Sequence, residues 1–190
     1  PGSQPVGEEV EWARLEPFLK EFVMAWPETR LSIDTYFSSV VRKSHDVCGS
    51  FIVNDISAGE DDPKMLQTVG DLGLAYVAMH KRGNSLTMQT MTDYEDVTAE
   101  VKDYFDRFAE KADAFRIKDW ILDPGFGFAK TVPQNFELIR NLPTFKSFGR
   151  PLLVGVSRKS MIYRYFDITP EESLPATQAL HMQALINGAD

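Results

Sequence analysis

The chain has 190 residues, of which 20 are Lys or Arg and 28 are Asp or Glu, so its formal net charge is −8. This acidity argues against a nucleic-acid partner, because phosphate backbones are bound through clustered Lys and Arg side chains. A single cysteine, Cys48, excludes a disulfide within the chain and suits a reducing compartment. No apolar run of about 18 residues occurs, so we expect no membrane partner and a cytoplasmic location.

Five short apolar runs predict β-strands. In chain order they are Arg30–Asp34, Phe51–Asp55, Ala75–Met79, Trp120–Asp123 and Leu152–Val156. Apolar residues at three- to four-residue spacing predict helices around them. These helical stretches are Trp12–Phe22, Tyr36–Val47, Asp62–Asp71, Val97–Phe115, Val132–Arg140 and Ser173–Asn187. Pro17 predicts a bend or a break in the first of them.

Strand followed by helix, five times over, indicates an α/β fold with a parallel sheet. The strand runs are nearly continuous in apolar residues, as expected when both faces of a parallel sheet are covered. Periodicity alone does not separate a doubly wound sheet from a (β/α)₈ barrel. Polar or charged residues end or follow every strand, however, and the strands of a barrel direct such groups to one mouth. We therefore favour the (β/α)₈ TIM barrel.

The segment Asp123-Pro124-Gly125-Phe126-Gly127-Phe128 follows a predicted strand and delivers a carboxylate into a glycine-rich turn. A plain turn would also account for this pattern. The nearby pair Lys130-Thr131 resembles the end of a phosphate-binding P-loop. That interpretation fails because Pro124 occupies the position where the P-loop needs its first glycine.

A second candidate site is Ser157-Arg158-Lys159-Ser160-Met161, directly after the last predicted strand. We expect a helix to begin here, so that free backbone N–H groups, two hydroxyls and two cations form an anion site. Helix capping by Ser157 beside solvated basic residues is the alternative.

Asp34 and Asn54 also end predicted strands, where they could simply bind loop N–H groups. Together with Asp123 they suggest a narrower role. Carboxylates accept hydrogen bonds, whereas an amide both donates and accepts them. Such groups at one mouth could recognise a flat heterocycle that carries N–H donors and a carbonyl group.

Five motifs follow one another along the chain. They are Leu31-Ser32-Ile33-Asp34-Thr35, Val53-Asn54-Asp55-Ile56-Ser57, Met79-His80-Lys81-Arg82-Gly83 with Thr87-Met88-Gln89, Asp123 to Phe128, and Leu153 to Ser160. In this order they resemble dihydropteroate synthase, a pterin-binding family. The opening Pro1-Gly2 is similar to the end of the family's Ser-Thr-Arg-Pro-Gly loop. Ala129 and Lys81-Arg82 depart from the usual family residues.

The resemblance implies a (β/α)₈ barrel in which residues 1–190 form one domain with about five of the eight strands. The first two strands and the last strand are expected to lie outside this chain. It also implies a transferase of folate synthesis, which condenses hydroxymethyl-dihydropterin pyrophosphate with 4-aminobenzoate to give dihydropteroate and pyrophosphate. A homodimer and sensitivity to sulfonamides are further family expectations.

The family's site residues match positions of this chain. The resemblance assigns Asp34, Asn54, Met79, Asp123 and Lys159 to the pterin, and Phe128, Lys159 and Ser160 to 4-aminobenzoate. It makes Asp123 and Lys159 the catalytic residues. Mg²⁺ is expected with the pyrophosphate, and the family's protein ligand for it lies outside this chain.

Two alternatives stay open at this point. A methyltetrahydrofolate–corrinoid methyltransferase is another pterin-binding barrel, but it does not need Ser157-Arg158-Lys159-Ser160 as an aminobenzoate site. A non-catalytic relative that acts as a binding partner would keep the fold and lack turnover.

Overall fold

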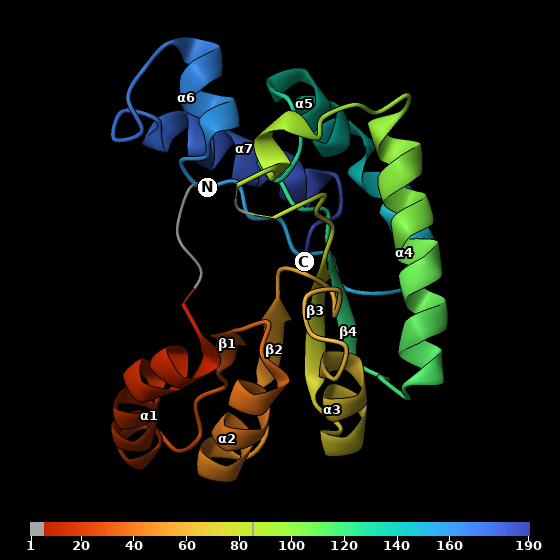
Figure 1. Cartoon of the computed structure of the whole chain (residues 1–190). Helices are drawn as coiled ribbons and strands as arrows, with labels where there is room; N and C mark the ends of the chain where they lie inside the picture. Colours follow the sequence, from red (N-terminus) through yellow and green to blue (C-terminus); the bar gives the residue numbers. More distant parts are fainter. Residues whose placement is uncertain (1–5, 85) are drawn as a thin grey trace. The chain divides into compact units, whose positions relative to one another are not determined.

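The structure, a computed structural model, describes residues 6–84 and 86–190 (Figure 1). The expected loop at Pro1-Gly2 lies outside these residues. The described chain forms two compact units that alternate along the sequence. The N-terminal unit comprises residues 6–78 and 108–120, and the C-terminal unit comprises residues 79–84, 86–107 and 121–190.

Four strands are arranged in the order β1-β2-β3-β4. They are β1 (Ser32–Asp34), β2 (Ile52–Asp55), β3 (Ala75–Met79) and β4 (Trp120–Asp123). β1 pairs with β2 and β2 pairs with β3 in parallel, and the register places Asp34 opposite Asn54. The predicted α/β class with a parallel sheet is confirmed.

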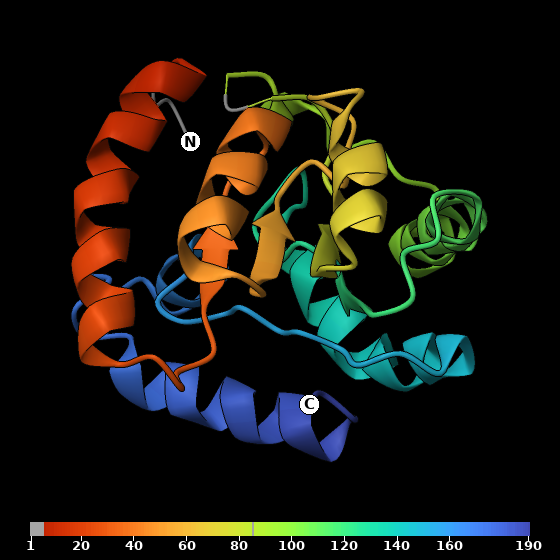
Figure 2. The ribbon, with the colours of Figure 1, turned by 90° about the horizontal axis from the view of Figure 1, so that it is seen from below.

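Three helices of the N-terminal unit are α1 (Glu8–Ala25), α2 (Ser38–Cys48) and α3 (Met65–Leu72). Figures 1 and 2 show α1 and α2 side by side. Pro17 lies inside α1 without interrupting it, so the expected break is absent. The residue is exposed, where the carbonyl group that loses its helical partner can bind water.

Aromatic packing forms the core of the N-terminal unit. The ring of Tyr76 is fully buried and stacks on Phe108, with 5.8 Å between the centroids. Trp120 also packs against Phe108, in an edge-to-face arrangement with 5.1 Å between the ring centroids. The Tyr76 hydroxyl donates a 2.6 Å hydrogen bond to the buried carboxylate of Asp55. Asp55 also accepts hydrogen bonds from the loop after β2, so it fastens that loop to the core.

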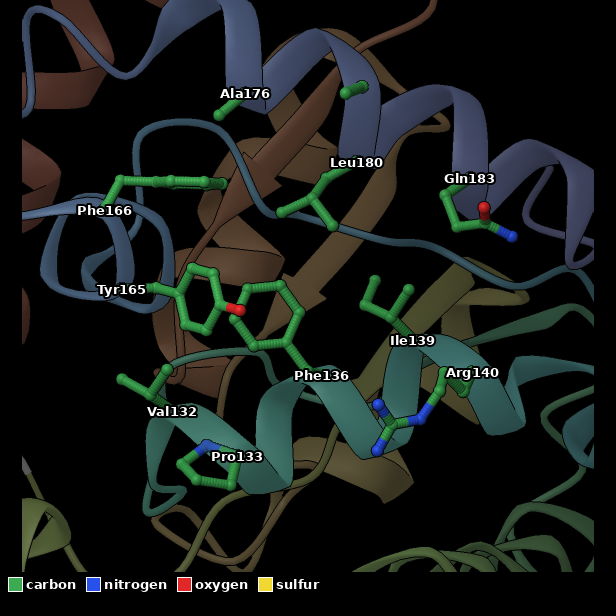
Figure 3. A pocket seen from close by; sticks show the side chains of 11 residues that line it. Val132, Pro133, Phe136, Ile139, Arg140, Tyr165, Phe166, Ala176, Leu180 and Gln183 are labelled. Atoms are coloured by element: carbon green, nitrogen blue, oxygen red, sulfur yellow. The ribbon is translucent and has the colours of Figure 1, made fainter.

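The remaining elements belong wholly or partly to the C-terminal unit. They are η1 (Met88–Thr90), α4 (Val97–Ala114), α5 (Val132–Asn141), η2 (Leu142–Phe148), α6 (Ser160–Phe166) and α7 (Leu174–Ile186). α5 begins at a capping box in which Thr131 and Gln134 satisfy each other's backbone N–H groups. An apolar groove of about 680 Å³ lies between α5, α6 and α7, where Phe136 and Tyr165 meet edge to face (Figure 3).

The predicted fifth strand, Leu152–Val156, is wrong in its extent. Only Leu152 forms a β-bridge, in parallel with Leu122 of β4. Two hydrogen bonds fix this bridge, from Leu122 N–H to the carbonyl of Pro151 and from Leu153 N–H to the carbonyl of Leu122. β4 ends one residue later, and Pro124 has no N–H with which to extend the ladder.

Candidate active site

The turn after β4 is held by its own polar groups. The Asp123 carboxylate accepts a 2.8 Å hydrogen bond from Gly125 N–H, and the Asn135 side chain accepts one of the same length from Gly127 N–H. Gly125 has a φ of 72°, and a β-carbon there would lie only 2.0 Å from the carbonyl oxygen of His80. The turn therefore needs glycine at this position, both for its conformation and for its close approach to the end of β3.

Two lysines converge on this turn. Lys159 Nζ donates a hydrogen bond to the carbonyl of Phe126 and lies 4.9 Å from the centroid of the Phe128 ring. Lys130 Nζ lies 3.0 Å from the carbonyl oxygens of both Gly125 and Phe128. The structure thus brings together three residues predicted for the site, Asp123, Phe128 and Lys159, and adds a fourth.

Burial and charge act in opposite directions on Asp123. Burial raises the pKa of its carboxyl group, while the Gly125 N–H group and the cations Lys159 and Lys130 oppose that rise. Burial likewise lowers the pKa of Lys159, and the attraction of Asp123 opposes this effect. A carboxylate between two partly desolvated ammonium groups can accept hydrogen bonds from a ligand while its charge stays compensated.

Asp34 and Asn54 form a second polar pair, in the N-terminal unit. They face each other across the β1–β2 ladder, and the Asn54 amide donates a hydrogen bond to the Asp34 carboxylate. Asp34 is exposed and Asn54 is half-buried. The structure thus brings together two of the three strand-end residues from which the sequence suggested a heterocycle site, and their role in binding stays a prediction.

A helix begins within the Ser157–Met161 segment, as predicted. α6 starts at Ser160, and its N-cap residue is Lys159 rather than Ser157, with no capping hydrogen bond from the Lys159 side chain. Arg158 is exposed and adopts a positive φ of 49°, whereas Lys159 is half-buried. The two cations therefore do not form one anion site, and only Lys159 reaches the turn after β4.

Met79 and Ser160 occupy contrasting environments in the C-terminal unit. Met79 ends β3 and is buried, and the Tyr104 hydroxyl lies 3.5 Å from its carbonyl oxygen. Ser160 is half-buried at the first position of α6.

His80 and Lys130 are site residues that sequence reasoning missed. Lys130 Nζ lies 2.9 Å from His80 Nδ1, and both side chains are buried. Burial, together with the nearby cations Lys130, Arg82 and Arg107, lowers the pKa of His80 to about 2, so its ring is neutral. The sequence offered no sign of this pairing, because 50 residues separate the two side chains.

The described residues do not fit a metal centre. Within residues 6–84 and 86–190, no group of three or more His, Cys, Asp or Glu side chains could hold a metal ion. The expected Mg²⁺ therefore enters no step derived below. In the same part of the chain, no helix combines the length and apolar character that a membrane crossing requires.

The chain belongs to the pterin-binding enzyme family. The family model described as "Pterin binding enzyme" matches residues 1–190. Dihydropteroate synthase of Escherichia coli strain K12 is 38% identical to this chain over 191 residues, which are 100% of this chain and 67% of the relative. The chain thus spans about two thirds of that protein's length.

Solved structures agree with this assignment. The dihydropteroate synthase of Yersinia pestis, in complex with a sulfonamide drug, matches with a TM-score of 0.94 and 31% identity, over 100% of this chain and 69% of the other. The Xanthomonas albilineans dihydropteroate synthase with 4-aminobenzoic acid matches with a TM-score of 0.90 and 32% identity, over 100% of this chain and 67% of the other. These neighbours are TIM barrels, so the predicted fold class is confirmed.

Proposed function

We propose that the protein is a dihydropteroate synthase, which condenses hydroxymethyl-dihydropterin pyrophosphate with 4-aminobenzoate to give dihydropteroate and pyrophosphate. The observation that carries this proposal is the convergence of Asp123, Phe128 and Lys159 at the turn after β4. A carboxylate, a partly desolvated ammonium group and an aromatic ring are the groups that a pterin edge and an aromatic acid require. The relatives named above carry the same activity in their names.

The roles of the residues follow their chemistry. Asp123 accepts hydrogen bonds from the N–H groups of the pterin, and Asp34, Asn54 and Met79 contribute to the same substrate. Lys159 serves both substrates.

For 4-aminobenzoate, the Phe128 ring packs against the aromatic ring and Ser160 binds the carboxylate. Ser160 suits this role because the first residues of a helix carry free N–H groups.

The reaction needs no strong general base. The bond between the pterin methylene carbon and the pyrophosphate oxygen breaks first, and pyrophosphate leaves with the electron pair. The amino nitrogen of 4-aminobenzoate then attacks the resulting pterin cation and loses a proton as the C–N bond forms. Fixed charges such as Asp123 and Lys159 stabilise this charge separation because they are already oriented before reaction.

Three further expectations belong to this proposal. Mg²⁺ would accompany the pyrophosphate, the protein would act in the cytoplasm, and it would form a homodimer. Light scattering on the full-length protein tests the last of these.

The decisive experiment assays the full-length protein for dihydropteroate formation. Lys159→Ala should lower turnover or substrate affinity by about 2–4 kcal/mol, because it removes one partner of a desolvated charged contact. Lys20→Ala is the matched control, since Lys20 is an exposed lysine that pairs with Glu16 on the preceding turn of α1. Unchanged kinetics in Lys159→Ala would contradict the role of this residue.

The assay also separates the alternatives. A folded wild-type protein that forms no dihydropteroate would favour the non-catalytic relative. Binding of a pterin without binding of 4-aminobenzoate, even with pyrophosphate present, would favour the corrinoid methyltransferase.

A further inference from the structure

Lys130 is a buried cation whose hydrogen-bonding capacity is fully used. Only 6% of its surface is exposed. Its Nζ atom lies 2.9 Å from His80 Nδ1 and 3.0 Å from each of the carbonyl oxygens of Gly125 and Phe128. An ammonium group has three N–H donors, and a neutral amine has only two. Three acceptors around one nitrogen therefore match the charged form.

The His80 ring completes this arrangement as an acceptor. Because the ring is neutral, one of its nitrogens carries a proton and the other accepts. The short contact with Lys130 assigns the accepting role to Nδ1 and the proton to Nε2. A protonated ring would instead place two cations against each other in a buried site.

Lys130 and Asp123 hold the same glycine from opposite sides. Asp123 accepts from the N–H group of Gly125, and Lys130 donates to its carbonyl group. Lys130 also donates to Phe128 O, while Lys159 donates to Phe126 O. Five of the six residues from Asp123 to Phe128 thus take part in these contacts. Asp123 carries a charge itself, Gly125, Phe126 and Phe128 are bound by charged side chains, and Gly127 is bound by Asn135.

We propose that Lys130 is a positioning residue of the active site, which fixes the turn after β4 and keeps the Asp123 carboxylate ionised for the pterin. This inference rests on the proposed function, because it takes the pterin as the ligand of Asp123. Lys130 itself does not touch the substrate. It acts through the two carbonyl groups of the turn and through its charge.

The charges around the two groups support this role. Asp123 faces the cations Lys130 and Lys159, and Lys130 faces Asp123, Lys159 and Arg82. Burial lowers the pKa of Lys130 to about 7, and the attraction of Asp123 opposes that change. Below that pH the ammonium form of Lys130 prevails, so its charge is present there to oppose the rise in the pKa of Asp123.

The test measures pterin affinity of the full-length protein between pH 4 and pH 7, by calorimetric titration of a pterin. Affinity of the wild-type protein should fall at acid pH as Asp123 takes up a proton, and Asp123→Asn should lack this fall.

Lys130→Met preserves the length of the side chain and removes its charge. A nearby cation lowers the pKa of a carboxyl group, so the fall in affinity should move to higher pH in Lys130→Met. A loss of packing alone would not move it.

Two further variants keep the result decisive. Lys102→Met is the matched control, because Lys102 is a half-buried lysine that pairs with Asp106 on α4, and the pH profile of this variant should equal that of the wild type. Lys130→Arg retains the charge and should leave the acid fall near its wild-type position. If Lys130→Met does not fold, a displaced acid fall in folded Lys130→Arg would overturn the inference.

The outcomes also separate the inference from the function on which it rests. An unmoved acid fall in folded Lys130→Met would overturn the role of Lys130 and leave the proposed function intact. A wild-type protein that binds no pterin would overturn both.

Discussion

At the residue scale, Asp123 is a buried carboxylate whose charge is compensated by Lys159 and Lys130. Asp123→Asn keeps the volume of the side chain but replaces one acceptor with an NH₂ group, which would then face the N–H donors of the ligand. Leaving those donors unpaired should cost about 1–3 kcal/mol. At about 1.4 kcal/mol per tenfold change, pterin affinity should fall by roughly ten- to a hundredfold or more.

Calorimetric titration of a pterin into the full-length protein measures this loss, with circular dichroism as the control for folding. Little change in folding is expected, because Pro124 and Gly125 still shape the turn. Equal affinities in two folded proteins would return Asp123 to the role of a turn residue.

The lowered pKa of His80 should make the free energy of unfolding depend on pH. Its pKa is about 2 in the folded protein and near 6.5 when unfolded, so the unfolded state binds more protons between these values. The free energy of unfolding should therefore fall as the pH decreases below about 6.5. His80→Asn keeps an acceptor at the position of Nδ1 but does not titrate, so this part of the pH dependence should disappear.

Urea unfolding of wild type and His80→Asn at pH 7 and pH 5 measures the effect. The stability difference between the two proteins should shift in favour of the variant at pH 5. A parallel loss in both proteins would show that His80 is protonated in the folded state.

At the residue scale, the sequence predicted the groups that end strands and missed the groups that support them. Asp34, Asn54 and Asp123 each follow an apolar run, and this position is visible without a structure. The pairing of Lys130 with His80 depends on two side chains that come together only after folding. A buried lysine also looks like any other lysine in a sequence.

At the scale of elements, the turn between β4 and α5 should tolerate substitution least at Gly125. Gly125→Ala would place a β-carbon 2.0 Å from a backbone carbonyl oxygen, in a positive-φ conformation. Gly149→Ala is the matched control, since Gly149 has a similar φ of 60° but no neighbour within 4 Å of the added atom.

Both variants should lose about 1 kcal/mol to the left-handed backbone. Gly125→Ala should lose about 1–3 kcal/mol more through overpacking, and pterin affinity should fall with it because Asp123 is bound to this turn. Urea unfolding and pterin titration provide the two measurements. Equal losses in the two variants would contradict the close packing of the turn against the end of β3.

Element boundaries were predictable where packing and local chemistry agree. The predicted limits of β3 and β4 are confirmed, because continuous apolar runs end there in polar residues. The extent of the fifth strand was not predictable. It depends on the neighbouring strand β4, which ends at Asp123 and is followed by Pro124, a residue without an N–H group to extend the ladder.

At the scale of the whole molecule, large apolar side chains are exposed on α6 and α7. They are Tyr165, Phe166, Leu174, Met182, Leu185 and Ile186. β1 also forms one edge of the sheet, with no further strand beside it in the described chain. Exposed apolar patches and free strand edges both favour association.

We therefore expect the 190-residue chain, when expressed alone, to self-associate as its concentration rises. Ile186→Lys should reduce this association, because Ile186 is 71% exposed. Gln178→Lys, at an exposed polar position of α7, adds the same charge and should have little effect. Analytical ultracentrifugation over a concentration series decides the question, and a monomer at every concentration would contradict it.

The alternation of the two units along the chain has a consequence for biosynthesis. Residues 6–78 leave the ribosome before residues 108–120, yet Tyr76 packs in the finished molecule on Phe108, which also contacts Trp120. Domains fold as units during synthesis, from the N-terminus onward. Here the N-terminal unit must wait, with apolar surface uncovered, until the intervening segment of the other unit has been translated. We therefore expect the nascent chain to expose this apolar surface until Trp120 has emerged, and slower translation before that codon would prolong the exposure.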